Sequence, residues 1–342
     1  MIHFECDYTE GAHENIMRRL LNTNLDQTCG YGMDPICDSA REKIRIACQA
    51  PDAQVHFLVG GTQTNMTVIA AALKPYQGVL CADSGHINVH ETGAIESTGH
   101  KALALKSENG KISAAAVREA VEAHYASGSF EHTVQPGMVY ISHPTEVGTL
   151  YSLEELTALS TTCHALGLPL FVDGARLGYA LECGDVTLPD LARLCDVFYI
   201  GGTKCGALFG EAVVITNPAL AKDFRYSLKQ RGGMLAKGRL LGIQFDELFT
   251  DDLYSRICSE AVRKAMRLQK TVKEKGIPLW FESPTNQQFV ILTPEQKAKL
   301  SEQFVLEEWG ETEDGGQITR ICTSWATTEE NFEALLAAVK AL

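Results

Sequence analysis

The sequence predicts an α/β protein with a mostly parallel sheet in a large domain and a smaller α+β domain after it. Up to residue 216, short and continuously apolar runs alternate with amphipathic helical stretches. Strands without polar alternation are typical of a parallel sheet that helices cover on both faces. A chain of 342 residues is also longer than the domains that a single hydrophobic core usually supports, so two domains are expected.

The individual elements follow from these runs. The predicted strands are VHFLVGG (55–61), GVLCAD (78–83), GMVYISHPT (137–145), LPLFVDGA (168–175), DVFYIGG (196–202) and GEAVVIT (210–216). Helices are expected at 65–74 and at 152–166, where Ser152 and Glu155 form a capping-box pair. The later part of the chain predicts one helical stretch at 246–276, strands at 289–293 and 318–326, and a closing helix at 328–342.

We therefore place the large domain at 15–245 and the small domain at 246–342, with the N-terminal segment 1–14 near the functional site. The formal net charge of −13 argues against a nucleic-acid partner, because that binding depends on Lys and Arg. No leader-like apolar stretch opens the chain and no window approaches ~18 apolar residues, so a cytoplasmic protein without a membrane segment is expected. The eleven cysteines form no C-x-x-C pair, which favours reduced thiols over disulfides or a metal site.

Candidate functional residues are sought where the strands end, because ligands of such sheets gather there. In FLVGGTQTN (57–65) a glycine pair precedes a helix. The backbone N–H groups at Gly61 and Thr62, together with the helix dipole, suit a phosphate. An ordinary helix cap at Thr62 or Thr64 is the alternative explanation.

Two charged residues follow strongly apolar strands. Asp173 is followed three residues later by Arg176. A buried carboxylate needs donors or a cation, and an Asp173–Arg176 ion pair would satisfy it too. Lys204 lies in GGTKCG (201–206), where desolvation favours a neutral, nucleophilic amine. A lysine that reaches out into solvent is the alternative.

Taken together, these positions describe one ligand. The combination fits pyridoxal 5′-phosphate, whose phosphate would bind at Thr62, whose pyridinium nitrogen would face Asp173 and whose aldehyde would react with the amine of Lys204. His86, in SGHINVHETG (84–93), would lie against the ring or carry protons. His90 and Glu91 are expected to start the next helix.

Over nearly its whole length the chain resembles the threonine aldolase/beta-eliminating lyase family of aspartate-aminotransferase-like enzymes that use this cofactor. The resemblance rests on an ordered set of motifs: YGMDP (31–35), GGTQTN (60–65), SGHINVHETG (84–93), VDGARL (172–177), GGTKCG (201–206), RGGM (231–234) and ITRICTSWAT (318–327). It implies fold type I, with a seven-stranded, mostly parallel sheet. It also implies a homodimer or homotetramer with active sites at the subunit interface.

The resemblance also implies roles for the cofactor-binding residues. Lys204 would form the covalent bond with the cofactor aldehyde, and Asp173 would pair with the ring nitrogen. His86 would stack on the ring, and the backbone at Gly61 and Thr62 would hold the phosphate.

Further residues are implied to bind the amino-acid substrate. Arg176 would contact the cofactor's phenolic oxygen or the substrate carboxylate, and Arg320 would bind that carboxylate with its planar set of donors. Tyr31 and residues 229–234 could serve a neighbouring subunit. No metal site is expected.

The chain departs from the family pattern at several places. The family's RSDT reads ECDY here, which puts Cys6 where a serine helps to hold the substrate carboxylate, and a thiol is a weak donor. The family's ENTHNG reads HPTEVG (143–148), so Glu146 stands in place of a proposed catalytic histidine. GGTKCG replaces the commoner LSKGLG. These changes affect the substrate's β-substituent and the catalytic base rather than the cofactor.

The resulting hypothesis is a carbon–carbon lyase that reversibly cleaves L-threonine, L-allo-threonine or a related β-hydroxy-α-amino acid to glycine and an aldehyde. The base would be His86, Glu146 or a water between them. The alternative is β-elimination, racemisation or transamination of another amino acid at the same Lys204 and Asp173. Its elimination products would be pyruvate and ammonia. A cofactor-free binding protein is a third hypothesis. The intact set of site residues argues against it.

Overall fold

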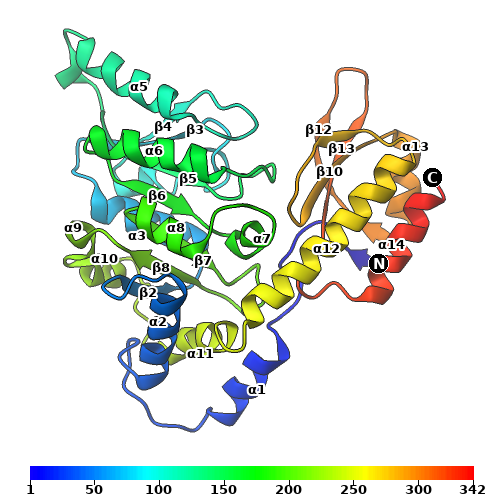
Figure 1. The fold of residues 1–342 in the computed structure, drawn as a ribbon, viewed down its shortest axis with the longest axis horizontal. Helices are drawn as coiled ribbons and strands as arrows, with labels where there is room; N and C mark the ends of the chain where they lie inside the picture. Colours follow the sequence, from blue (N-terminus) through cyan, green and yellow to red (C-terminus); the bar gives the residue numbers. More distant parts are fainter.

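The computed structural model describes residues 1–342, and its core is a seven-stranded sheet (Figure 1). The strand order is β2-β8-β7-β6-β5-β3-β4, and only β8 runs antiparallel to its neighbours. The strands are β2 (Gln54–Leu58), β3 (Gln77–Ala82), β4 (Ala102–Leu105), β5 (Gln135–Ser142), β6 (Leu170–Asp173), β7 (Val197–Gly201) and β8 (Glu211–Ile215). The predicted α/β class and mostly parallel sheet are confirmed.

One strand of this sheet is absent from the six runs that the sequence predicts. It is β4, which lies at the sheet edge and has only four residues, one of them buried. A short edge strand that is partly open to solvent does not produce the continuous apolar run by which the other six are recognised.

Helices cover both faces of this sheet. Alternate residues of the central strands enter separate cores: Phe198 of β7 belongs to one and Tyr199 to the other. One face is covered by α3 (Gly61–Ala72), α4 (His86–Val89), α9 (Pro218–Ala221) and α10 (Phe224–Gln230). The other is covered by α1 (Glu14–Asn22), α2 (Pro35–Ala47), α5 (Ala114–Ala126), α6 (Leu153–Ala165), α7 (Leu177–Leu181), α8 (Leu188–Leu194) and α11 (Arg239–Leu248). Two short 3₁₀ turns span η1 (Glu96–Thr98) and η2 (Phe130–His132).

A second, antiparallel sheet lies beside the first, with strand order β12-β13-β10-β9. Its strands are β9 (Leu279–Phe281), β10 (Gln287–Leu292), β12 (Glu307–Glu311) and β13 (Gln317–Cys322). The helices that accompany it are α12 (Leu253–Glu274), α13 (Pro294–Ser301) and α14 (Glu329–Lys340). In Figure 1 the long helix α12 runs from the base of the large sheet up along the small one.

The N-terminal segment is anchored in this smaller part. β1 (Ile2–His3) pairs in parallel with β11 (Phe304–Val305), and the ring of Phe4 is buried in the core of the smaller part. The next residues cross from there toward the large sheet. This anchoring fixes the path of residues 5–8, which matters for the site below.

The single helix predicted over 246–276 is wrong. Helix α11 ends at Leu248 and α12 begins at Leu253, and the turn between them contains Asp251 and Asp252 at φ +50° and +55°. Asp is one of the few residues that adopts this left-handed conformation readily, and it breaks the helix here. The division of the chain at residue 246 stays a prediction; since α11 runs through that residue, we propose that the smaller domain begins with α12.

The cysteines are all free thiols, and every one except Cys29 and Cys183 is buried. None of the helices combines the length and the apolar character that crossing a membrane requires, α12 included.

The end of β6 packs against β7 so tightly that only glycine fits there. A Cβ atom added to Gly174 would lie 2.0 Å from the carbonyl oxygen of Tyr199. The clash is with backbone, which cannot rotate away as a flexible side chain would. This contact fixes Asp173, the residue before Gly174, against its neighbours on β7.

We expect Gly174→Ala to lower the free energy of unfolding by at least about 2 kcal/mol, because the two strand ends must move apart. Denaturant unfolding measures the change. The matched control is Gly128→Ala, at an exposed position where an added Cβ meets nothing within 4 Å. It should change stability by no more than about 0.5 kcal/mol. Equal stability of the two variants would contradict the account of this packing.

Candidate active site

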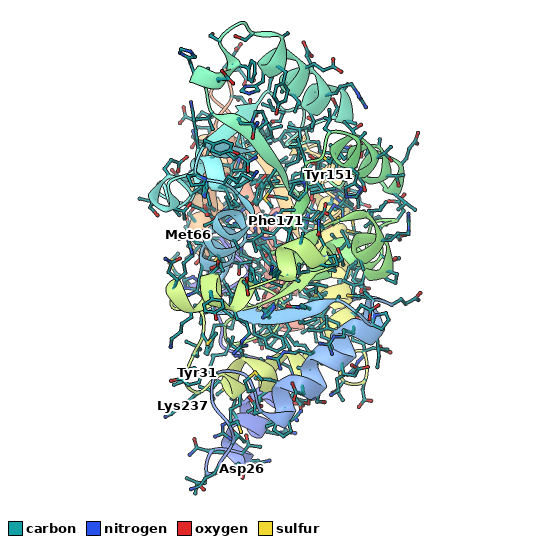
Figure 2. All side chains as sticks on the ribbon, turned by 90° about the vertical axis from the view of Figure 1, so that its left-hand side faces the viewer. Asp26, Tyr31, Met66, Tyr151, Phe171 and Lys237 are labelled. Carbon is teal, nitrogen blue, oxygen red and sulfur yellow. The ribbon has the colours of Figure 1, made fainter.

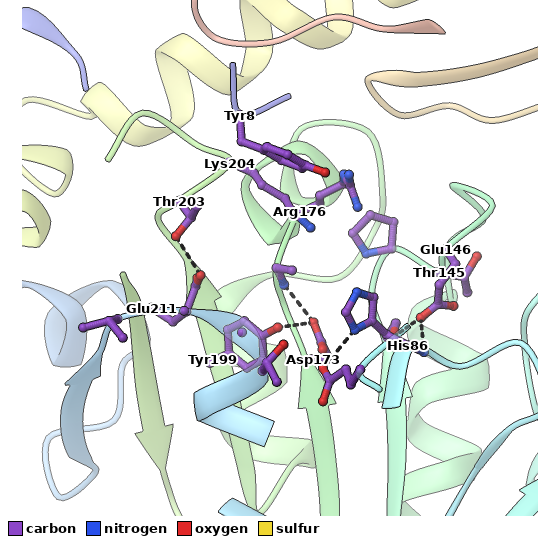
Figure 3. Close-up of a pocket in the computed structure, with 18 residues that line it drawn as sticks. Tyr8, His86, Thr145, Glu146, Asp173, Arg176, Tyr199, Thr203, Lys204 and Glu211 are labelled. Carbon is purple, nitrogen blue, oxygen red and sulfur yellow. Dashed lines mark hydrogen bonds and ion pairs between the residues drawn. The ribbon is translucent and has the colours of Figure 1, made fainter. Parts of the chain in front are cut away.

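A cavity of about 340 Å³ opens at the carboxyl ends of the parallel strands. It brings together seven of the residues that the sequence singles out: Gly61, Thr62, His86, Glu146, Asp173, Arg176 and Lys204 (Figure 3). An adjoining cavity of about 250 Å³ shares Tyr8, His86, Glu146, Arg176 and Lys204 with it and extends to Arg320 on β13. The candidate site therefore lies between the two sheets.

Asp173 ends β6 as a buried carboxylate held by four donors. Its Oδ1 accepts from the Tyr199 hydroxyl at 2.5 Å and from the backbone N–H of Ala175 at 3.0 Å. Its Oδ2 accepts from the Tyr140 hydroxyl at 2.6 Å and from Asn65 Nδ2 at 3.1 Å. The four donors come from α3, β5, β7 and the turn after β6, so the packing of these elements holds the carboxylate in place.

The electrostatic balance keeps Asp173 ionised. Burial alone would raise its pKa, but the positive charge of His86 and the bonds from Tyr140 and Tyr199 outweigh burial and hold the pKa below its usual value. The ion pair between Asp173 and Arg176 considered from the sequence is absent.

Arg176 instead pairs with Asp7, from the N-terminal segment. Its Nε donates to Asp7 Oδ2 at 2.7 Å and its Nη2 to Asp7 Oδ1 at 3.0 Å, a two-point contact. Asp7 is fully buried and also accepts from Asn286 Nδ2 at 2.9 Å. Burial would raise the pKa of Asp7, but Arg176 outweighs it and the pKa is lowered. The Nη1 group of Arg176 has no protein partner.

His86 is held by a carboxylate that the sequence analysis misplaced. Its Nδ1 donates to Glu91 Oε1 at 2.9 Å, and the same oxygen accepts from Asn65 Nδ2 at 2.8 Å. Burial would lower the pKa of His86, yet Glu91 and Asp173 raise it above its usual value. The expectation that His90 and Glu91 start a helix is wrong, because both follow α4.

Glu146 faces the cavity from the loop after β5. Its Oε1 accepts from the Ser142 hydroxyl at 2.6 Å and from the backbone N–H of His86 at 2.9 Å. Its Oε2 has no protein donor. Burial raises the pKa of Glu146 despite the Ser142 hydrogen bond. It is thus a carboxyl group that holds a proton more readily than usual.

Lys204 reaches into the cavity beside Tyr8 and Arg176 (Figure 3), so the alternative of a lysine directed into bulk solvent is wrong. Its Nζ donates no hydrogen bond within the protein and lies 5.8 Å from the centre of the Tyr8 ring. Burial and the nearby Arg176 lower its pKa, against the attraction of Asp7 and two other carboxylates. A lowered pKa increases the fraction of neutral amine, the form that attacks an aldehyde.

The N-terminus of α3 is open toward the cavity. The helix begins at Gly61, and no side chain caps it. Thr64 Oγ1 donates to the Gly60 carbonyl at 3.0 Å instead, so the proposed cap at Thr62 or Thr64 is wrong. A Cβ on Gly60 would meet nothing within 4 Å. Gly60, Gly61 and Thr62 line the cavity, so the first backbone N–H groups of the helix and its dipole are available to an anion there.

Two of the sequence candidates, Cys6 and Tyr31, line neither of these two cavities. Cys6 is buried and lines neither cavity, while Tyr8, two residues further on, lines both. Burial raises the pKa of the Cys6 thiol. Tyr31 is 47% exposed at the far end of the molecule, near Lys237 (Figure 2), and its ring lies 4.8 Å from Lys229 Nζ.

Arg320 lines the adjoining cavity with both of its Nη groups already hydrogen-bonded, whereas its buried Nε has no partner in the protein. Its Nη1 donates to Gln287 Oε1 at 3.1 Å, and its Nη2 donates to the Glu5 carbonyl at 3.0 Å and to the carboxylate of Glu307. Its guanidinium carbon lies 4.9 Å from the centre of the Trp309 ring. Glu307 stands opposite Arg320 in the register of β12 and β13, a pairing for which the sequence gives no local signal.

Comparisons with known proteins agree with this geometry. The family model for beta-eliminating lyases matches residues 4–294. A low specificity L-threonine aldolase from Pseudomonas aeruginosa is 33% identical over 85% of this chain and 84% of its own. A solved structure of a threonine aldolase from Leishmania major is 42% identical, with a TM-score of 0.96 over 100% of this chain and 99% of that one.

A more distant structure bears on the fold alone. An aspartate aminotransferase single mutant from Thermus thermophilus is 16% identical, with a TM-score of 0.72 over 100% of this chain and 91% of that one. The predicted aspartate-aminotransferase-like fold of type I is thereby confirmed. Family and fold are those of pyridoxal-phosphate-dependent enzymes, and the predicted enzyme class, a lyase, is confirmed as well. The chain belongs to the beta-eliminating lyase family, with threonine aldolases among its relatives.

Proposed function

We propose that this enzyme binds pyridoxal 5′-phosphate and cleaves L-threonine, L-allo-threonine or a related β-hydroxy-α-amino acid to glycine and an aldehyde. The observation that carries the proposal is the convergence of Lys204 and Asp173 on one cavity beside the uncapped start of α3. The names of the Pseudomonas aeruginosa and Leishmania major relatives, both threonine aldolases, support this reaction over the alternatives.

The residues of the cavity fit the cofactor. The backbone at Gly61 and Thr62 would hold the phosphate, and the ionised carboxylate of Asp173 would hold the ring nitrogen protonated. His86 would lie against the ring, in an orientation fixed by Glu91. When bound, the cofactor joins an amine through its aldehyde and accepts the electron pair released when a bond to the substrate's α-carbon breaks.

We assign the substrate carboxylate to Arg320, with the free Nη1 of Arg176 and the hydroxyl of Tyr8 as further donors. Tyr8 takes the place that the sequence gave to Cys6, which lines neither cavity. Since Glu307 already accepts from Arg320 Nη2, the incoming carboxylate must displace Glu307 or share the guanidinium with it.

Glu146 is the proposed base for the β-hydroxyl proton. Glu146 lines the cavity, its Oε2 has no protein donor, and its raised pKa makes it a stronger base than an ordinary carboxylate. His86 suits this task less well, because Glu91 and Asp173 favour its protonated form.

We further propose a cytoplasmic homodimer or homotetramer in which Tyr31 and residues 229–234 face the active site of a neighbouring subunit. Free thiols without disulfides support that compartment. Large apolar side chains of α1, α10 and the chain between α1 and α2 are exposed in the single subunit and would be covered by a second copy: Leu21, Leu25, Tyr31, Met33 and Tyr226.

Lys204→Ala should abolish covalent attachment of the cofactor, because no other amine is placed at its aldehyde, and lower activity by more than roughly 10³-fold. Borohydride reduction followed by peptide mass spectrometry locates the modified lysine. Lys222→Ala, an exposed lysine remote from the cavity, serves as control and should leave both readouts unchanged. A cofactor found on another lysine would contradict the assignment. The wild-type products must be glycine and an aldehyde; pyruvate and ammonia would indicate β-elimination.

Glu146→Gln should lower kcat by about 10²–10⁴-fold and leave the visible spectrum of the bound cofactor unchanged, because the amide cannot take up the β-hydroxyl proton. The base must be ionised to act, so wild-type kcat rises as the pH passes the pKa of Glu146. Because burial raises the pKa of Glu146, this acidic limb of the pH profile lies above the usual glutamate pKa of ~4.3. An unchanged kcat in the variant, or an acidic limb that persists in it, would exclude Glu146 as the base.

Glu307→Gln should lower KM for the amino acid by about tenfold, which corresponds to about 1.4 kcal/mol, with little change in kcat. The reason is that an amide competes more weakly than a carboxylate for Arg320. Steady-state kinetics separate the two constants, and Glu308→Gln, on the same strand with its charge paired to Lys297, is the control. A raised or unchanged KM would mean that Glu307 does not compete with the substrate.

A further inference from the structure

Glu211 is a buried acid in the candidate site to which the proposed reaction gives no task. It is the first residue of β8, is 3% exposed and lines the cavity with Lys204. Its Oε2 accepts from the backbone N–H of Gly202 at 3.1 Å, and its Oε1 accepts from the Thr203 hydroxyl at 2.9 Å. No Lys or Arg lies within ion-pair distance of it. Such a carboxylate is costly to ionise without a cation.

The register of the sheet places Glu211 beside the start of α3. It stands opposite Leu58 on β2 and opposite Gly201 on β7. The chain continues from Leu58 through Val59 and Gly60 into the uncapped helix, and both of these residues line the cavity together with Glu211. Figure 3 shows the side chain of Glu211 on the Thr203 side of the cavity, away from Glu146. Glu211 therefore lies at the end of the cavity that is proposed to hold the cofactor phosphate.

We propose that Glu211 is neutral when the cofactor is bound, and that at any pH where Glu211 is ionised in the free protein, binding of the phosphate group draws one proton from solvent onto its carboxyl group. A phosphate dianion and an ionised carboxylate in the same poorly hydrated space would repel each other strongly. The protonated acid removes this repulsion, and its O–H adds a hydrogen-bond donor to the phosphate end of the cavity. The inference rests on the cofactor site proposed above.

The surroundings of Glu211 support a proton at moderately alkaline pH even before the phosphate arrives. Burial raises the pKa of Glu211 to about 8, against the lowering effect of Thr203 and Lys204, while the negative charge of Asp173 adds to the rise. The other titratable groups nearby, Tyr199 and Tyr254, are neutral phenols, since burial raises the pKa of each well above its usual value. Their hydroxyls donate to Asp173 and to the Gly201 carbonyl, not to Glu211.

The sign of the pH dependence follows. Below the pKa that Glu211 has in the cofactor-free protein, its carboxyl group already carries the proton, and the phosphate binds at full strength. Above it, the proton must be taken up on binding, so affinity for the phosphate group falls by about tenfold per pH unit. Replacing Glu211 by Gln removes this effect because the amide is neutral at every pH.

The test measures Kd for pyridoxamine 5′-phosphate, which has no aldehyde and cannot bond to Lys204, and for pyridoxamine, which lacks the phosphate. Above pH 8, the ratio of wild-type to Glu211→Gln Kd should rise by about tenfold per pH unit with pyridoxamine 5′-phosphate and stay constant with pyridoxamine. The ionisations of the ligands cancel in this ratio. Glu274→Gln, which removes an exposed charge, should keep the wild-type pH dependence. A constant ratio with pyridoxamine 5′-phosphate, or equal slopes with both ligands, would overturn the inference.

A second measurement needs no variant. Calorimetric titrations of the wild-type protein at pH 9, in two buffers of different ionisation enthalpy, give the protons taken up on binding. Uptake should be greater by nearly one proton with pyridoxamine 5′-phosphate than with pyridoxamine, and equal uptake would overturn the inference. Failure of pyridoxamine 5′-phosphate to bind at any pH would instead overturn the cofactor site itself, and this inference with it.

Discussion

The candidate site depends on one buried negative charge, the carboxylate of Asp173. An ionised carboxylate away from water is costly by several kcal/mol unless donors surround it, and here four donors from four segments do so. Tyr140 and Tyr199 reach it only because β5, β6 and β7 are in register, and Asn65 reaches it from α3. The demand for donors at this one position thus constrains the whole centre of the sheet, and the same donors preorganise the carboxylate for the cationic ring nitrogen that we propose as its partner.

A second ion pair connects the two sheets. Asp7 and Arg176 are 169 residues apart in the sequence, and their contact ties the N-terminal segment to the loop after β6. Because β1 is hydrogen-bonded within the smaller part, this contact also fixes the smaller part over the cavity. It brings Tyr8 next to Lys204 and holds Arg320 within reach of the same space. The cavity thereby receives its proposed cofactor-binding groups from one sheet and its proposed carboxylate-binding group from the other.

Much of the fold and the centre of the site could be predicted because the relevant signals are local. A strand buried on both faces is a continuous apolar run, and Asp173 and Lys204 are conspicuous as charges that directly follow such runs. The partners could not be predicted in this way. Asp7 and Glu307 meet their arginines through tertiary contact or strand register, for which no spacing in the sequence gives evidence. The place of Glu211 in the cavity could not be predicted either. It lies on the antiparallel strand β8, whose direction depends on the sheet topology rather than on the neighbouring residues in the sequence.

The central claim is that Asp173 and Lys204 hold opposite ends of one pyridoxal ring, with the phosphate at the start of α3. A crystal structure of the enzyme grown with pyridoxal 5′-phosphate tests it most directly. The account predicts continuous electron density between Lys204 Nζ and the cofactor, the ring nitrogen within hydrogen-bond distance of Asp173, and the phosphate against the backbone N–H groups of Gly61 and Thr62. A cofactor bound elsewhere, or a ring turned so that its nitrogen points away from Asp173, would contradict it.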